Sequence, residues 1–262
     1  MTTLNEASAV RMGTTVVSRV YAGPTQAWPV LPTGYAGVVL GTPGLVGYWR
    51  LGEAAGSSVA ADAKGTNPGT YVGSPTLGIA GAIAGNTAMR PIPSGYVSVP
   101  DSASLDTGNV FTYEAWVWRD VAATYQGLFG KGRNSAGLYI QPSGILRCDK
   151  HQVAHVRDSS VIVPTGGWHH IVFTKNGAAA LWYIDGADAS GSGTGSAVID
   201  NTAFALFIGA TNDAGLLHGE LNPLTEPAPL GNIGLYGIDE AAVYNVALTP
   251  GQVLAHYNAR TA

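Results

Sequence analysis

The sequence is poor in charge and in cysteine. Charged residues make up 11% of the 262 positions, the net charge is −4 at pH 7, and Lys and Arg form no run. These features argue against binding to nucleic acid or to anionic membrane surfaces. The single cysteine, Cys148, excludes an internal disulfide, so cysteine usage gives no evidence of secretion. Cys148 ends a short apolar–polar run, and we expect it to be a buried strand residue rather than a reactive thiol.

Long hydrophobic runs are also missing. No stretch approaches the ~20 apolar residues that a membrane-spanning helix needs. Residues 1–6 lack the basic segment and apolar run of a signal peptide. We therefore expect a protein that is made in the cytoplasm, stays soluble and does not insert into a membrane.

Recognisable catalytic constellations are absent as well. No Gly-x-Ser-x-Gly motif occurs. His169 and His170 are adjacent on a predicted strand and should point to opposite faces, so a single metal ion could not bind both. Glycosidases need two carboxyl groups ~5–10 Å apart, but Asp239 and Glu240 are adjacent and should also lie on opposite faces. Glu114 has no acid two residues away, and we expect it to accept hydrogen bonds from a neighbouring strand. We therefore expect a protein that is not an enzyme.

Glycine and β-forming residues are abundant instead, with 36 Gly and 46% hydrophobic residues. Residues 110–118 are β-branched, aromatic or small except for Glu114, which predicts a long central strand. Alternation places large apolar groups on both of its faces, so we expect a second sheet on one face and further cover on the other. Residues 167–175 repeat this pattern, and Asn176-Gly177 predicts a hairpin to residues 181–184.

The remaining strands are short and closely spaced, and only one helix is predicted. Thr249 is a suitable N-cap for it, with Pro250 at the first position and Gln252 completing a capping box. On this helix, His256 has no evident partner. Residues 190–196 are all Gly, Ser or Thr, and we expect a mobile loop there. The pattern predicts an all-β, two-sheet antiparallel jelly-roll sandwich over residues 43–262, with one short C-terminal helix.

Residues 1–42 are predicted to form an N-terminal extension. Residues 14–21 indicate a strand, 22–25 a turn and 26–29 a return strand, which together give a β-hairpin too small to be stable alone. Pro and Gly in the stretch that follows indicate a linker. Exposed apolar groups on a small appendage usually contact a partner. The residues that we expect to bind this partner are Val20, Tyr21 and Trp28.

Five motifs follow one another in a characteristic order: Val46-Gly47-Tyr48-Trp49-Arg50-Leu51, Phe111-Thr112 through Ala115-Trp116-Val117, Trp168 to His170, Tyr183-Ile184-Asp185-Gly186 and Gly237-Ile238-Asp239-Glu240. Their order resembles that of laminin-G-like, concanavalin A-like jelly rolls. The resemblance covers roughly residues 43–259, and it implies a lectin-like surface.

The same resemblance implies one calcium ion at the edge of the sandwich. Asp62 matches the acidic residue of the early loop, and Asp239 matches the acid of the last strand. Residues 62–67 could supply the hard oxygen ligands that calcium prefers. The alternative is an Asx-turn at Asp62 and a surface ion pair at Asp239.

The N-terminal segment contains Met12-Gly13-Thr14, Val17 to Gly23 and Trp28-Pro29. These residues resemble the short N-terminal motif of minor tail proteins from tailed phages of actinobacteria. It implies a virion protein that contacts other virion subunits, forms homo-oligomers within the particle and binds host cell-surface polysaccharide. The alternatives are an architectural or decoration protein that binds no glycan, and a bacterial carbohydrate-binding module.

For a glycan site we expect rim loops that combine aromatic and polar side chains. Trp118 ends the central strand, and Tyr125 lies in the loop that follows it. The candidates are Trp118, Tyr125, Arg133, Asn134 and Tyr139. The alternative for all five is ordinary packing.

Overall fold

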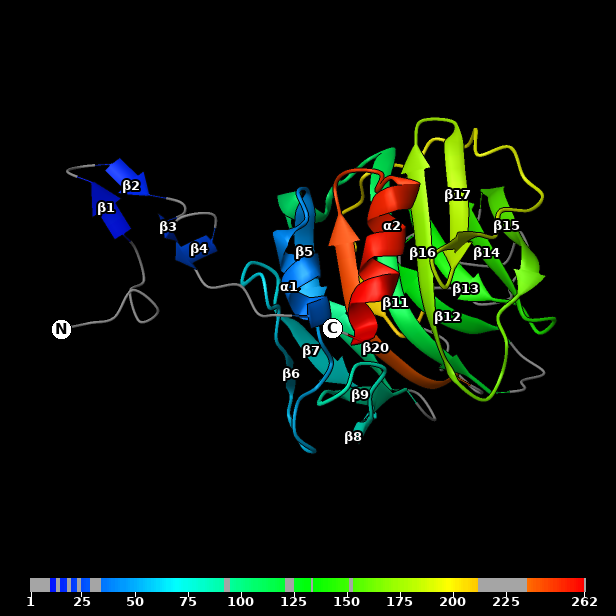
Figure 1. Ribbon diagram of the computed structural model, residues 1–262. Helices are drawn as coiled ribbons and strands as arrows, with labels where there is room; N and C mark the ends of the chain where they lie inside the picture. The colour runs from blue at the N-terminus through cyan, green and yellow to red at the C-terminus, as the bar shows by residue number, and fades with distance from the viewer. Residues whose placement is uncertain are drawn as a thin grey trace.

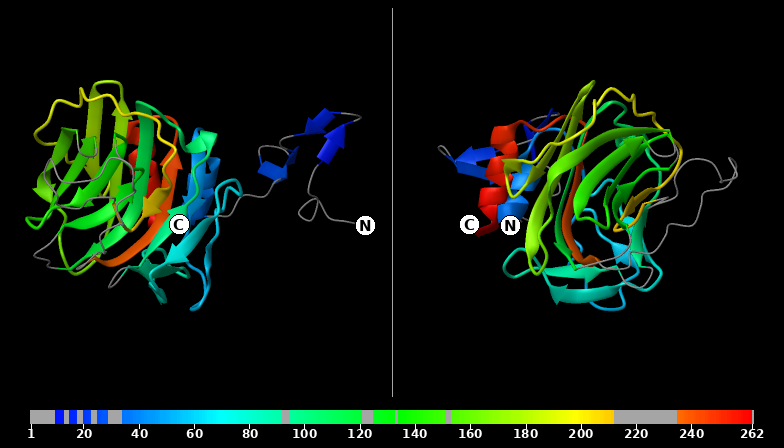
Figure 2. Two further views of the ribbon diagram at one scale, coloured as in Figure 1. Left: turned by 180° about the vertical axis from the view of Figure 1, so that it is seen from behind. Right: turned by 90° about the vertical axis from the view of Figure 1, so that its right-hand side faces the viewer.

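The computed structural model describes residues 34–261 except 92–94, 121–124, 133, 151–152 and 212–234. In the N-terminal segment it describes the backbone of four short strands: β1 (Val10–Met12), β2 (Thr15–Val17), β3 (Val20–Ala22) and β4 (Thr25–Trp28). Two large antiparallel sheets face each other, and two helices lie on the outside of one of them (Figures 1 and 2). The predicted two-sheet jelly-roll sandwich is confirmed.

We call the sheet that carries the helices the front sheet. Its strand order is β18 (Ala187–Asp188), β17 (Ala179–Ile184), β16 (Trp168–Asn176), β11 (Val110–Arg119), β20 (Leu235–Tyr244), β9 (Thr87–Arg90) and β8 (Thr76–Ala80), and β5 (Leu45–Trp49) also pairs with β20. The predicted central strand is β11, which lies between β16 and β20. The predicted hairpin is β16–β17, in which Ile171 pairs with Ile184 and Asn176 with Ala179.

The back sheet forms the other layer. Its strand order is β15 (Ala154–Ile162), β14 (Ile145–Lys150), β13 (Ala136–Ile140), β12 (Gln126–Gly130), β19 (Leu206–Ile208), β10 (Tyr96–Val99), β7 (Gly69–Val72) and β6 (Val59–Ala60). The main core fills the space between the sheets and includes Phe111, Tyr113 and Val117 from one face of β11. Cys148 is buried in this core, as the sequence predicted.

The opposite face of β11 contributes to a second apolar cluster, which packs under helices α1 (Gly34–Gly41) and α2 (Pro250–Asn258). Trp116, Tyr48 and Tyr244 come from the sheet, and Val39 and Val253 come from the helices. The expectation that both faces of the central strand need cover is confirmed, and the cover on the outer face is helical (Figure 1).

Helix α1 was not predicted, because residues 34–41 had been interpreted as part of a linker. The segment contains three glycines and two valines, so its intrinsic helix propensity is low. Tertiary packing stabilises it instead, since Tyr35, Ala36 and Val39 are buried. Helix α2 has the predicted cap, in which Thr249 and Gln252 bond reciprocally and Pro250 opens the helix. None of the helices in the described residues is long and apolar enough to be a membrane span.

Two further expectations need correction. Residues 190–196 do not form a loose loop, because their backbone is hydrogen-bonded along β15: Gly191 donates to Asp158, and Gly195 donates to Val156. In the N-terminal segment the predicted strand over residues 14–21 contains β2 and most of β3, and residues 14 and 18–19 lie outside the described residues. These two strands belong to two small hairpins, β1–β2 and β3–β4, which are part of neither large sheet. Ala22 pairs with Thr25, and residues 23–24 of the predicted turn lie outside the described residues.

Two truncations should separate the extension from the sandwich. A chain that begins at residue 34 keeps α1 and should unfold at the same denaturant concentration as the full chain. A chain that begins at residue 42 loses Tyr35 and Val39, which are buried, and should lose at least ~3 kcal/mol at ~1.5–3 kcal/mol for each buried side chain. Urea unfolding followed by tryptophan fluorescence measures both. Equal stability of the two truncated chains would contradict the role of α1.

Candidate functional site

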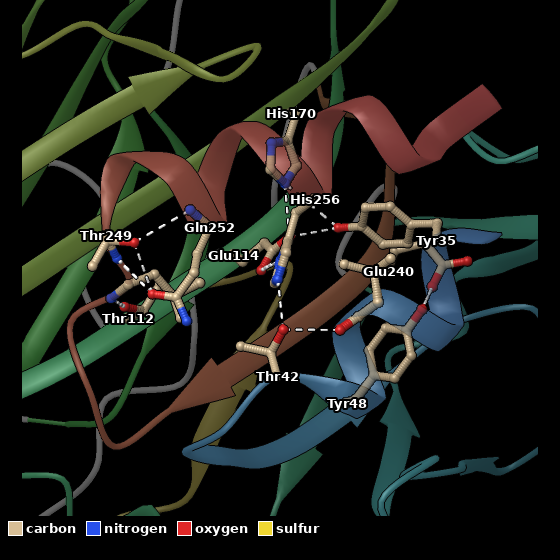
Figure 3. Close-up of polar contacts among 12 residues, drawn as sticks. Tyr35, Thr42, Tyr48, Thr112, Glu114, His170, Glu240, Thr249, Gln252 and His256 are labelled. Atoms are coloured by element: carbon tan, nitrogen blue, oxygen red, sulfur yellow. Dashed lines mark hydrogen bonds and ion pairs between the residues drawn. The ribbon is translucent and has the colours of Figure 1, made fainter. Parts of the chain in front are cut away.

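A buried carboxylate lies under the two helices at the middle of β11. Glu114 is 0% exposed and accepts hydrogen bonds from Tyr35 Oη (2.7 Å), His170 Nε2 (2.7 Å) and His256 Nδ1 (3.0 Å). Figure 3 shows these three side chains converging on Glu114 from α1, β16 and α2. The expectation that Glu114 accepts from a neighbouring strand is confirmed, with two further donors from the helices.

The hydrogen bonds assign the protons of the two histidines. Thr42 Oγ1 donates to the Val38 carbonyl at 2.8 Å and is also 2.8 Å from His256 Nε2, so this nitrogen donates to the threonine oxygen. Both nitrogens of His256 therefore face acceptors, which favours the charged imidazolium. His170 Nδ1 is buried and has no partner among the described residues, and Nε2 is the nitrogen that donates to Glu114.

The charge of this cluster is thus nearly balanced. Burial raises the pKa of Glu114, but the charge of His256 and the hydrogen bonds from His170 and His256 outweigh it, and the net pKa lies well below its usual range. Burial lowers the pKa of His256, but the Glu114 carboxylate outweighs it, and the net pKa is raised. Because Glu114, His170 and His256 are almost fully buried, this cluster holds the helices on the sheet and offers no surface to a ligand.

Asp239 and Glu240, the two adjacent acids of strand β20, do not lie on opposite faces as the sequence predicts. Asn86 Nδ2 donates to both Asp239 Oδ1 (3.1 Å) and Glu240 Oε1 (2.9 Å), so the carboxylates lie close together and not on opposite faces. The cause is an irregularity in the pairing of β20 with β11, together with a left-handed backbone at Glu240 (φ 51°). Tyr48 Oη and Arg50 Nη2 donate to Glu240 as well.

These acids are also inaccessible, since both are 0% exposed. Burial and the nearby charge of Glu240 raise the pKa of Asp239 well above its usual range. The alternation argument against a paired-carboxylate site is therefore wrong at this position, although the pair is enclosed by protein.

Asp62 occupies a tight turn. Its carboxylate accepts backbone N–H bonds from Tyr48, Lys64, Thr66 and Asn67 at 2.8–2.9 Å, as an Asx-type turn does. Asp239 instead accepts from the backbone of Ala82 (2.8 Å). Among the described residues, no group of three or more His, Cys, Asp or Glu side chains is placed to hold a metal ion. The shared calcium site of Asp62 and Asp239 stays a prediction.

Of the five residues predicted to bind glycan, the four that the structure describes do not lie together in one place. Arg133 lies outside the described residues. Asn134, partly exposed, has a left-handed backbone (φ 68°) and accepts from the Asp200 backbone through its carbonyl. Tyr125 packs edge-on against Tyr139, with ring centroids 5.5 Å apart.

Tyr139 belongs to a network on the back sheet in which polar groups pair with one another. Its hydroxyl donates to Asp149, and only 8% of the residue is exposed. The neighbouring Arg147 donates twice to Asp158, at 2.7 and 2.9 Å. Within the described residues, Tyr125 and Tyr139 thus contact each other, while Tyr139 and Asn134 also bond to Asp149 and Asp200.

Trp118 lies on the front sheet and is part of a row of side chains that crosses four neighbouring strands. Trp168 on β16 pairs directly with Trp118 on β11, and their ring centroids are 5.9 Å apart. The ring of Tyr236 on β20 is 4.7 Å from that of Trp118. The Arg90 guanidinium, from β9, lies 4.6 Å from the centre of the Tyr236 ring. We call these four residues the aromatic row, and each of them is partly exposed.

A glycine creates the space for this row. A Cβ at Gly237 would lie 2.6 Å from Cη2 of Trp168, so only glycine lets the indole lie against β20. Trp168, Tyr236 and Arg90 were not identified from the sequence. The pairing of the two tryptophan-bearing strands was predictable, but the position of β9 beside β20 follows from contacts between residues far apart in the chain.

Comparison with known proteins identifies a family and a set of similar folds. Residues 93–254 match the family model described as the concanavalin A-like lectin/glucanases superfamily. No curated protein sequence matches the chain.

Solved structures resemble the chain at low identity. A Trypanosoma rangeli sialidase in complex with 2,3-difluorosialic acid has a TM-score of 0.58 and 16% identity, over 83% of this chain and 33% of the sialidase. Domain 4 of AbnA, an extracellular arabinanase from Geobacillus stearothermophilus, was solved with arabinotriose and has a TM-score of 0.55 and 22% identity, over 81% of this chain and 98% of that domain. The binding domain of Paraclostridial Mosquitocidal Protein 1 has a TM-score of 0.54 and 15% identity, over 82% and 52%. The chain spans a third of the sialidase, and these likenesses show the fold.

The Glu114 cluster should give stability a defined pH dependence. Because the pKa of Glu114 is lower in the folded chain than its value of ~4.3 in the unfolded chain, Glu114 stabilises the fold above pH ~4.3. This stabilisation is lost as the pH falls through the folded pKa. Because the pKa of His256 is higher in the folded chain than its value of ~6.5 in the unfolded chain, His256 stabilises the fold below pH ~6.5. This stabilisation is lost as the pH rises through the folded pKa. Glu114→Gln should cost roughly 3–5 kcal/mol and remove the decline in stability above pH ~6.5.

Chemical unfolding between pH 4 and 9 measures this difference. Asp200→Asn is the control, because Asp200 forms an exposed pair with Lys150 that should contribute about 0–1 kcal/mol. Parallel pH profiles for the wild-type chain and Glu114→Gln would show that the cluster does not titrate as described.

Proposed function

We propose that this chain, which belongs to the concanavalin A-like lectin/glucanases superfamily, binds glycans through the aromatic row of the front sheet without catalysing a reaction. The observation that carries the proposal is the partly exposed row of Trp168, Trp118 and Tyr236. Aromatic rings combine an apolar face with low conformational freedom, and they suit the C–H faces of sugar rings.

The geometry of the row fits an extended ligand. Neighbouring strands lie ~4.8 Å apart, so a row across four strands spans about 14 Å. Its members come from β16, β11, β20 and β9, which are adjacent in the front sheet. Such a row suits an oligosaccharide that lies across the strands. The arabinotriose complex of the similar arabinanase domain is a precedent for glycan binding on this fold.

The absence of catalysis is part of the proposal. Among the acids of the described residues, Glu114, Asp239 and Glu240 are each 0% exposed. A glycosidase needs a carboxyl pair that reaches the scissile bond. The carboxylates of Asp239 and Glu240 accept hydrogen bonds from Asn86, Arg50 and Tyr48, so this pair of acids stabilises the last strand.

Trp118→Ala and Trp168→Ala should each weaken glycan binding at least tenfold, because stacking area on the row is lost. The ligand is first identified on a glycan array that includes bacterial cell-wall polysaccharides, and affinity is then measured by isothermal titration calorimetry. Tyr125→Ala, on the back sheet, is the matched aromatic control and should bind normally. If the wild-type chain binds no glycan, or the tryptophan variants bind as well as it does, the aromatic row is not a glycan site.

We further propose that the chain is a minor tail protein of a phage virion that presents this surface to host polysaccharide. Support comes from the resemblance of residues 12–29 to phage tail proteins and from the two small hairpins outside the sandwich. In this proposal Val20, Tyr21 and Trp28 contact other virion subunits, and the chain occurs there as a homo-oligomer. Strands β3 and β4, which carry these residues, are paired.

The chain that begins at residue 34 tests the virion proposal. It retains α1 and the whole sandwich and should bind glycan normally, but it should not join phage particles. Trp28→Ala should reduce incorporation in the same direction, because a buried interface tryptophan often carries a large share of the binding energy. Quantitative mass spectrometry of purified particles measures copy number. Incorporation of the truncated chain at the normal copy number would contradict the proposal and favour a module from another source.

A further inference from the structure

Arg90 differs from the other arginines of the described residues. Its guanidinium makes no hydrogen bond to another described residue, and within the described part of the chain its polar contact is with the face of the Tyr236 ring. Its Nε is buried without a partner, as are those of Arg119 and Arg157. The other arginines whose side chains the structure describes all donate to oxygen: Arg50 to Glu240, Arg147 to Asp158, Arg119 to Val163 and Pro142, Arg157 to Gly193, and Arg260 to Tyr257. Arg90 is therefore a cation that lies against an aromatic ring and whose guanidinium has no oxygen acceptor among the described residues.

The position of Arg90 gives this feature a functional meaning. It ends strand β9, and the residue before it, Met89, pairs with Ile238 of β20. Arg90 therefore lies at one end of the aromatic row, beside Tyr236 and partly exposed. A ligand that covers the rings would bring its last unit next to the guanidinium.

We infer that the aromatic row selects glycans that carry a carboxylate, such as uronic or sialic acids, and that Arg90 binds this group. The inference rests on the proposed glycan-binding function and names the class of ligand. A guanidinium presents N–H donors in a planar fork that matches a carboxylate. Hydrogen bonds between charged partners are stronger than those to neutral hydroxyls, and partial burial beside Tyr236 reduces screening by solvent.

The rest of the surface adds to the selectivity. The chain has a net charge of −4, so it does not attract anions in general. An acidic sugar therefore gains binding affinity only where its carboxylate contacts Arg90. The stacking faces and the cation lie in one line across the sheet. The ligand class is thus an acidic oligosaccharide that binds by stacking along its length and by charge at one end.

Matched pairs of ligands test this inference. The probes are oligosaccharides of galacturonate, glucuronate and mannuronate and a sialyl trisaccharide, each compared with its methyl ester, which keeps the rings and removes the charge. For at least one pair the full-length chain should bind the acid about tenfold more tightly than the ester, and the difference should shrink as salt is raised. Calorimetry with each pair measures the ratio.

Substitutions test whether Arg90 causes the preference for the acid over the ester. Arg90→Gln should bind acid and ester alike, and Arg90→Lys should retain part of the preference because the charge remains. Arg260→Gln is the control, because Arg260 also lies over a tyrosine ring, Tyr257, at 3.8 Å, and it should keep the full acid preference. Thermal unfolding of each variant verifies that the fold is retained.

The outcomes separate this inference from the proposed function. Binding that requires Trp118 but does not distinguish any acid from its ester would overturn the acidic-ligand inference and leave the proposed function in place. An acid preference that Arg90→Gln keeps would overturn the role of Arg90. Failure of every glycan, acidic or neutral, to bind would remove the proposed function and this inference with it.

Discussion

The carboxylate of Glu114 is the constraint on which the outer half of the molecule depends. A buried anion is costly unless donors surround it, and here the donors come from α1, β16 and α2. Each element that covers the front sheet therefore contributes one partner. Helix α1, with three glycines in eight residues, is stabilised chiefly by such tertiary contacts. The carboxylate fixes where the helices lie, and it does so because water is excluded from its surroundings.

This arrangement divides the outer face of the front sheet. One part lies under α1 and α2, where Trp116 packs between Tyr35 and Tyr257. Further along the same face of β11, Trp118 is partly exposed and joins Trp168 and Tyr236. Two tryptophans on one strand face thus differ in exposure, according to whether a helix lies above them.

The last strand shows how one backbone irregularity alters the chemistry of a site. Regular alternation would place Asp239 and Glu240 on opposite faces, but the left-handed residue at Glu240 brings both carboxylates to Asn86. Their proximity raises the pKa of Asp239 in addition to the effect of burial. The pair is nevertheless enclosed, so the structure uses these acids to fasten β20 to its neighbours.

Local pattern was enough to predict the two-sheet sandwich, the central strand β11, the β16–β17 hairpin and the cap of α2, because each depends on residues close in sequence. The Asx-type turn at Asp62 was foreseen as one of two alternatives for the same reason. The sequence did not reveal α1, the irregularity at Glu240, the partners of Glu114 or the aromatic row. The donors to Glu114 are 79, 56 and 142 residues away from it. Such contacts depend on which strands become neighbours and which helix covers them, and only the tertiary structure decided that.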